Sequence, residues 1–174
     1  MTKLVAVVGG KHSGKTTVVE NLIAELKLRG YRVGAVKEMV RTPLLDIPEK
    51  ETGRYSKAGA EIIVAVPRQE TVIFVKKRLS LKELLVYTKS LDYAVLEGFE
   101  SEKAIPKIMV IKNFDEAQQY FNSSVFLVSG IITEIKKDEF VSSFGIPMLN
   151  SKRDIKQIVN VVEQKALDSS LVDF

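Results

Sequence analysis

One glycine-rich segment constrains this chain more than any other feature. It reads Gly9-Gly10-Lys11-His12-Ser13-Gly14-Lys15-Thr16 and matches the pattern G-x-x-x-x-G-K-[ST]. An apolar β-rich run at residues 4–8 precedes it, and apolar residues recur at helical spacing between Val18 and Leu26. A strand, a glycine turn and a helix in this order predict a phosphate-binding loop, because its N–H groups converge on phosphate oxygens at the positive end of the helix.

The residue types within this loop suit a nucleotide triphosphate with Mg²⁺. We expect Lys15 to reach the β and γ phosphates and to be a catalytic residue, and the Thr16 hydroxyl to be a metal ligand, since Mg²⁺ prefers oxygen donors. His12 is interpreted as facing solvent. The alternative is a glycine-rich turn that holds no ligand. The predicted nucleotide-binding set is Gly9, Gly10, Lys11, His12, Ser13, Gly14, Lys15, Thr16 and Thr17.

A second acid is needed near the metal, and a buried strand at residues 93–98 offers two candidates. Asp92 stands at its start and Glu97 at its end. The two are ~16 Å apart at the rise of a strand, and ligands of open parallel sheets bind at the carboxyl ends of strands. Glu97 is therefore the predicted metal ligand and catalytic acid, whereas Asp92 is expected to cap or end the preceding element. A surface carboxylate is the alternative for Glu97.

Strand and helix patterns alternate along the rest of the chain. This order predicts a doubly wound α/β fold with a mostly parallel sheet, the P-loop NTPase fold, with right-handed crossovers. We expect a single domain over residues 1–174 with a frayed tail at 166–174. Residues 38–57 are interpreted as a long functional loop. Strands are expected at 31–36, 62–66, 72–75, 108–111, 125–128 and 148–149, and helices at 15–30, 80–91, 134–141 and 151–166.

The two short strands around Pro67 are predicted to form a β-hairpin at the sheet edge, a surface for a partner or for a homodimer. The basic and acidic residues, 26 and 22, are interspersed, which argues against a nucleic-acid partner. Apolar runs such as residues 62–66 are shorter than the ~20 residues of a membrane span, and no signal peptide is evident. With no cysteine in the chain, we expect a cytoplasmic protein.

Three further segments resemble the molybdopterin-guanine dinucleotide biosynthesis protein B family. They are the loop from Asp46 to Arg54 with Ala58-Gly59-Ala60, the strand from Asp92 to Phe99, and Pro106-Lys107-Ile108. The likeness covers the first two thirds of the chain, up to Lys112. Two departures stand out: Lys37 is followed by Glu38-Met39-Val40 instead of a histidine-rich stretch, and Glu49 replaces a glycine.

The resemblance implies a GTP-binding accessory protein of molybdenum-cofactor maturation, with GTP and Mg²⁺ as cofactors. It implies, as partners, the guanylyltransferase that joins GMP to molybdopterin and molybdopterin itself. Asp46 is a candidate metal ligand. Arg54 and Lys50 could neutralise phosphate charge of the nucleotide or of a pterin, or they could be solvated loop charges. Lys37 is a candidate for anion contact, with a salt bridge as the alternative.

Two other functions stay open at the level of sequence. One is an ATP-dependent small-molecule kinase, which would share the phosphate cradle. The other is a non-catalytic adapter that is switched by nucleotide. The expected enzymatic activity is at most a slow Mg²⁺-dependent GTPase. Lys112-Asn113-Phe114-Asp115 holds the residue types of the guanine signature N-K-x-D in the wrong order, so guanine preference follows from the resemblance alone.

Overall fold

The computed structural model describes residues 1–39, 50–135 and 144–172. The chain divides into two compact units, the first made of Met1–Glu38 and Leu84–Phe174 and the second of Met39–Glu83. The expectation of a single domain over the whole chain stays a prediction. The candidate ligand Asp46 lies outside the described residues.

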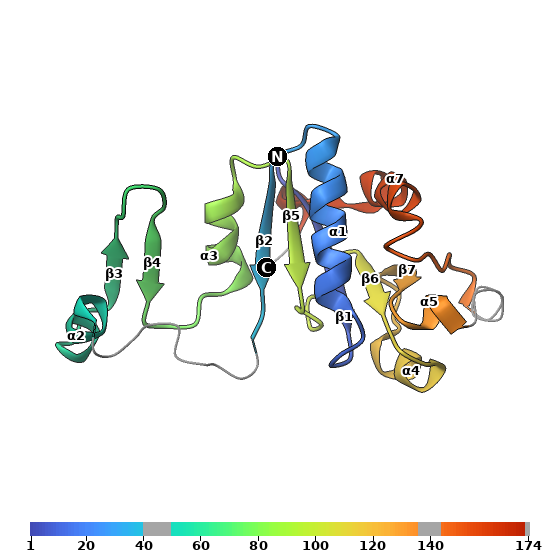
Figure 1. Ribbon diagram of the computed structural model, residues 1–174, viewed down its shortest axis with the longest axis horizontal. Helices are drawn as coiled ribbons and strands as arrows, with labels where there is room; N and C mark the ends of the chain where they lie inside the picture. Colours follow the sequence, from blue (N-terminus) through green and yellow to red (C-terminus); the bar gives the residue numbers. More distant parts are fainter. Residues whose placement is uncertain (40–49, 136–143, 173–174) are drawn as a thin grey trace. The chain divides into compact units, whose positions relative to one another are not determined.

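A parallel sheet forms the centre of the first unit (Figure 1). Its strands lie in the order β2-β5-β1-β6-β7, and each neighbouring pair is parallel. Because β1 lies in the middle of this order, the strands are added in opposite directions on its two sides. The carboxyl end of β1 lies at this switch point. The doubly wound fold is confirmed. The strands are β1 (Lys3–Gly9), β2 (Val33–Lys37), β5 (Tyr93–Glu97), β6 (Lys107–Val110) and β7 (Val125–Ser129).

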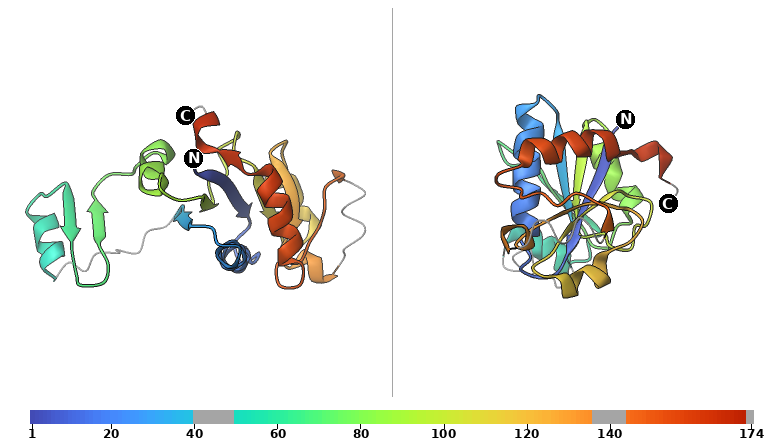
Figure 2. Two further views of the ribbon diagram at one scale, coloured as in Figure 1. Left: turned by 90° about the horizontal axis from the view of Figure 1, so that it is seen from above. Right: turned by 90° about the vertical axis from the view of Figure 1, so that its right-hand side faces the viewer.

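Helices cover both faces of this sheet. On one face α1 (Lys15–Leu28) and α7 (Ile155–Lys165) lie next to one another (Figure 2) and bury side chains such as Leu22 and Ile158 against the strands. On the other face α4 (Ala117–Tyr120) and α5 (Ile132–Ile135) pack against Met109 and Val128. The expected helix at 134–141 thus begins earlier, and residues 136–141 lie outside the described part.

The end of the chain differs from expectation. Residues 166–174 were expected to fray, but β8 (Leu167–Asp168) pairs antiparallel with Lys3 and Leu4 of β1, and a 3₁₀ turn, η3 (Ser169–Leu171), follows. The ladder between β6 and β1 begins only at Ala6, so the first residues of β1 keep an open edge that β8 fills. Residues 148–149 also differ, since Met148 makes only an isolated bridge to Val128.

The second unit contains α2 (Glu51–Lys57) and the hairpin of β3 (Ile62–Ala65) and β4 (Val72–Val75). The hairpin is present, but it forms a two-stranded sheet of its own instead of an edge of the central sheet. The interpretation of residues 51–57 as loop was wrong. This helix is two turns long and buries only Gly53, so it lacks the apolar periodicity that would reveal it.

A short helical segment, α3 (Leu81–Leu85) with the 3₁₀ turn η1 (Val86–Thr88), connects the second unit to the first along the chain. Its start is a capping box, since Ser80 and Glu83 have the S-x-x-E spacing of that motif. The backbone N–H of Ser80 donates to Glu83 Oε2 at 2.8 Å, and the backbone N–H of Glu83 donates to Ser80 Oγ at 3.3 Å. This reciprocal pair fixes the point at which the helix begins.

Candidate nucleotide-binding site

The glycine-rich loop lies between β1 and α1, as predicted, and its backbone requires glycine at two positions. Gly9 has φ of 144° and Gly14 has φ of 99°, values that side chains disfavour. A Cβ atom on Gly9 would lie 1.9 Å from the Val110 carbonyl oxygen of the neighbouring strand. Only a residue without a side chain therefore allows β1 to turn into the loop at this close approach. The loop shape follows from the sequence itself.

The ammonium group of Lys15 lies against the loop. Its Nζ donates to the carbonyl oxygens of Gly9 and Gly10, both at 2.7 Å. Burial lowers the pKa of Lys15 below its ordinary value, and the opposing attraction of Glu97 offsets part of that shift. A partly desolvated cation at the mouth of a backbone cradle is well placed to bind a phosphate oxygen.

Glu97 lies opposite the loop at the end of β5, where it meets two side chains. Thr16 Oγ1 donates to Glu97 Oε1 at 3.2 Å, and Lys37 Nζ forms an ion pair with the same oxygen at 3.0 Å. The carboxylate is buried, with 8% of the residue exposed. Lys37 thus forms a salt bridge, and its contact with an anion stays a prediction. The carboxylate thereby joins the ends of β2 and β5 to the first turn of α1.

Glu38, which stands where the resemblance leads one to expect a histidine-rich stretch, braces the turn after Glu97. Glu38 Oε2 accepts a hydrogen bond from the backbone N–H of Phe99 at 2.8 Å. Gly98 and Phe99 both have positive φ, 93° and 57°, and a Cβ on Gly98 would lie 3.0 Å from Glu38 Cβ. Glu38 thus holds a tight left-handed turn that fixes the position of the Glu97 carboxylate.

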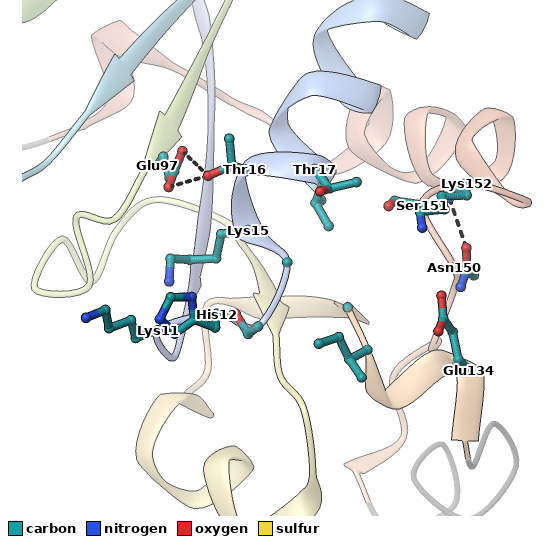
Figure 3. Close-up of a pocket in the computed structure, with 15 residues that line it drawn as sticks. Lys11, His12, Lys15, Thr16, Thr17, Glu97, Glu134, Asn150, Ser151 and Lys152 are labelled. Atoms are coloured by element: carbon teal, nitrogen blue, oxygen red, sulfur yellow. Dashed lines mark hydrogen bonds between the residues drawn. The ribbon is translucent and has the colours of Figure 1, made fainter.

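A pocket of about 560 Å³ opens beside the loop (Figure 3). Seven of the nine predicted nucleotide-binding residues line it, together with Glu97; Gly9 and Gly10 form the turn beneath. The remaining lining residues were not predicted: Val18 lies on α1, and the others follow β7 and Met148. The pocket is lined by Lys11, His12, Ser13, Gly14, Lys15, Thr16, Thr17, Val18, Glu97, Gly130, Ile131, Glu134, Asn150, Ser151 and Lys152.

Two other predicted positions have different surroundings. Asp92, at the start of β5, accepts from the backbone N–H of Arg32 at 2.7 Å, so it ties the end of one element to the next as expected. Arg54 lies on α2 in the second unit, and its role toward phosphate stays a prediction. Apart from Val18, the unpredicted lining residues could have been found from one signal: they follow β7 or the parallel bridge of Met148, whose carboxyl ends share an edge with the loop.

Thr16 and Glu97 form a donor set that fits a hard divalent cation, since a hydroxyl and a carboxylate are both oxygen ligands. Among residues 1–39, 50–135 and 144–172, no group of three or more His, Cys, Asp or Glu side chains could hold a metal ion. Mg²⁺ typically takes one or two protein oxygens and completes its shell with waters and phosphates. The pair therefore suits a metal that arrives with a nucleotide.

Within the described part of the chain, every helix is too short or too polar to cross a membrane.

Several solved structures share this fold. The crystal structure of Bacillus subtilis MobB aligns with a TM-score of 0.75 and 19% identity over 96% of this chain and 99% of that chain. A MobB homologue from Bacillus stearothermophilus gives a TM-score of 0.68 with 21% identity, over 92% of this chain and 96% of that one. At these identities the likeness establishes the fold.

Relatives in sequence are named for one biosynthetic process. The molybdopterin-guanine dinucleotide biosynthesis adapter proteins of Haemophilus influenzae and Escherichia coli are 32% and 30% identical over 111 and 119 residues. These matches cover 62% and 65% of this chain, and 62% and 67% of the relatives. A Methanocaldococcus jannaschii protein is 31% identical over 118 residues, 65% of this chain. The match spans only about half of that relative, 49% of its length.

The family model described as "Molybdopterin guanine dinucleotide synthesis protein B" matches residues 4–134, more than half of the 174-residue chain. The matched region contains the glycine-rich loop, Glu97 and the segments in which the resemblance was seen. The chain belongs to the molybdopterin guanine dinucleotide synthesis protein B family, MobB.

Proposed function

We propose that this chain is a GTP-binding adapter in molybdopterin-guanine dinucleotide biosynthesis, with Mg²⁺ and at most slow hydrolysis. The observation that carries the proposal is the pairing of Thr16 with Glu97 at the mouth of a pocket lined by the glycine-rich loop. The loop offers backbone N–H groups and Lys15 to phosphates, while the paired oxygens suit the metal. Family membership supports the pathway.

The bound nucleotide would serve a partner enzyme. The relatives are named adapter proteins, which supports a role beside the guanylyltransferase that joins GMP to molybdopterin. Such a role places the protein in the cytoplasm, where GTP is available. We keep Asp46 as a candidate metal ligand, and Arg54 as a candidate phosphate or pterin contact.

A kinase remains the competing function, and one observation disfavours it. P-loop kinases commonly place an acid after the second strand for the acceptor hydroxyl, whereas the end of β2 here is Lys37, paired with Glu97. The carboxylate of the next residue, Glu38, accepts a hydrogen bond from the backbone N–H of Phe99. Both groups stabilise the site instead of addressing an acceptor.

A homodimer through the hairpin is also part of the proposal. One face of the hairpin is apolar and exposed: Ile62 is 61% exposed, Val64 53% and Ile73 43%, and Val64 pairs with Ile73 across the strands. An apolar face of this kind suits a second copy of the chain. Sedimentation of Val64→Glu should show monomer where the wild type shows dimer, while Val86→Glu, also at an exposed valine, leaves the dimer intact. A dimer in both variants would refute this surface.

The proposed function is tested with Lys15→Ala. Removing a charge-assisted contact should lower GTP affinity roughly 10 to 150-fold, as titration calorimetry measures. Lys11→Ala, at an exposed lysine of the same loop, is the matched control and should have a smaller effect. Competition among GTP, ATP and molybdopterin then separates adapter from kinase. Wild-type affinity in Lys15→Ala would remove the nucleotide site from the glycine-rich loop.

A further inference from the structure

The pocket extends beyond the phosphate loop to a second wall. This wall is formed by Gly130, Ile131 and Glu134, which follow β7, and by the turn Asn150–Lys152. The turn comes soon after Met148, which bridges in parallel to Val128 of β7. In Figure 3, Thr17 lies between Thr16 and Ser151, so the second wall continues the pocket away from Glu97. A nucleotide whose phosphates occupy the loop would direct its base toward this wall.

The turn at Asn150 is rigidly held by its own hydrogen bonds. The side chain of Asn150, a residue only 7% exposed, donates from Nδ2 to Thr133 Oγ1 at 3.0 Å and accepts at Oδ1 from the backbone N–H of Lys152 at 2.9 Å. Both bonds of the Asn150 side-chain amide therefore hold the turn in place. Asn150 is therefore a positioning residue for its neighbours Ser151 and Lys152.

The hydroxyl group of Ser151 can still donate its own proton. Ser151 is 7% exposed, and its Oγ accepts a hydrogen bond from Asn21 Nδ2 at 3.3 Å. A hydroxyl that accepts from one neighbour can direct its own O–H elsewhere, and Ser151 lines the pocket. It can thus provide a hydrogen-bond donor at the second wall.

Glu134 and Ile131 complete the second wall. Figure 3 shows the Glu134 carboxylate turned toward Asn150 and the turn that carries Ser151. Ile131 is 41% exposed and lines the same pocket, where it offers an apolar surface to a ring. A carboxylate accepts hydrogen bonds only, so Glu134, Ser151 and Ile131 give the second wall an acceptor, a hydroxyl donor and an apolar face, beside the ammonium group of Lys152.

This combination matches one purine edge. Guanine presents N1–H and N2–H₂ donors next to the O6 acceptor, whereas adenine presents the N1 lone pair, which a carboxylate repels. We propose that Glu134 accepts hydrogen bonds from N1 and N2 of guanine while Ser151 donates to O6, an inference that rests on the proposed GTP-binding function.

The segment Lys112–Asp115, which holds the residue types of the guanine signature in the wrong order, makes local contacts within the protein. Lys112 forms an ion pair with Glu116, and Asn113 Oδ1 accepts from the Glu116 N–H.

The test changes the base that the site prefers. Full-length Glu134→Asn should bind GTP roughly 10 to 150-fold more weakly than wild type in the presence of Mg²⁺. It should gain affinity for XTP, because the amide can donate to the C2 carbonyl of xanthine. Asp115→Asn, at an exposed acid of the wrong-order segment, is the matched control and should leave both affinities unchanged. Ser151→Ala should weaken GTP and XTP alike, roughly 2 to 10-fold, since both bases carry O6.

Tripolyphosphate, which has no base, separates this inference from the proposed function. Glu134→Asn should bind it like wild type, whereas Lys15→Ala should bind it more weakly. Glu134 is exposed, so the variant should keep the wild-type melting temperature. Unchanged GTP affinity and no gain for XTP in Glu134→Asn would overturn the base assignment, even with the Lys15→Ala loss intact. Wild-type binding of tripolyphosphate by Lys15→Ala would instead overturn the proposed function.

Discussion

Thr16 Oγ1 donates a hydrogen bond to Glu97 Oε1 over 3.2 Å, although 81 residues separate the two along the chain. The bond joins the first turn of α1 to the end of β5, and these ends meet because β1 and β5 are parallel neighbours, with Val7 opposite Glu97. A hydroxyl and a carboxylate that already touch need little rearrangement to share a metal ion.

The first prediction concerns the charge of Glu97. Glu97→Gln should fold, because the amide oxygen can still accept from Thr16, but it removes the negative charge that would face Mg²⁺. We expect the gain in GTP affinity on adding Mg²⁺ to fall by about 10-fold or more. Calorimetry with and without Mg²⁺ measures this gain. Glu20→Gln, at an exposed acid of α1, is the control; an identical Mg²⁺ effect in both variants would show that another acid holds the metal.

Strand direction made part of the site predictable from sequence. The choice between Asp92 and Glu97 depended only on which end of a parallel strand faces ligands. The structure places Glu97 beside Thr16 and Asp92 beside the backbone of Arg32. The capping box of Ser80 and Glu83 was equally visible, since its two partners are three residues apart. Local spacing and strand polarity suffice for such features.

Non-local pairing could not be read from the sequence. The second wall of the pocket depends on the bridge between Met148 and Val128, and the ordered C-terminal segment depends on the pairing of Leu167 with Leu4. These pairings join distant segments whose register no periodicity specifies. Helix α2 was missed for another reason, because a two-turn helix that buries only Gly53 carries no amphipathic signal.

The second prediction concerns Lys107, a lysine with no exposed surface at the start of β6. Its Nζ donates to the carbonyl oxygen of Glu102, to that of Ile105 at 3.4 Å and to Ser124 Oγ at 3.0 Å. Lys107→Met keeps the apolar stem but leaves these acceptors without their donor. We expect the free energy of unfolding to fall by about 3 kcal/mol or more, since three acceptors lose their donor and each unpaired buried acceptor costs about 1 to 3 kcal/mol.

Urea unfolding of Lys107→Met against wild type measures this loss. Lys103→Met, at an exposed lysine on the preceding loop, is the control and should change stability by less than about 0.5 kcal/mol. Equal stability of the two variants would mean that the three acceptors do not depend on Lys107.

The third prediction concerns Glu83, where pH should change stability in a defined direction. Its Oε1 pairs with Lys77 Nζ at 2.8 Å and its Oε2 accepts from the Ser80 backbone, so the Lys77 contact first and the Ser80 bonds second lower the Glu83 pKa from 4.5 to about 2. A carboxylate with a depressed folded-state pKa stabilises fully above its unfolded pKa and loses that contribution as pH falls through the folded value. The stability difference between wild type and Glu83→Gln should therefore be constant above pH 4.5 and vanish toward pH 2.

Thermal unfolding of both proteins across this pH range measures the difference, and Glu70→Gln, at an exposed acid of the hairpin turn, is the control. A difference that stays level from pH 6 to pH 2.5 would mean that the Glu83 carboxylate titrates alike in the folded and unfolded chain.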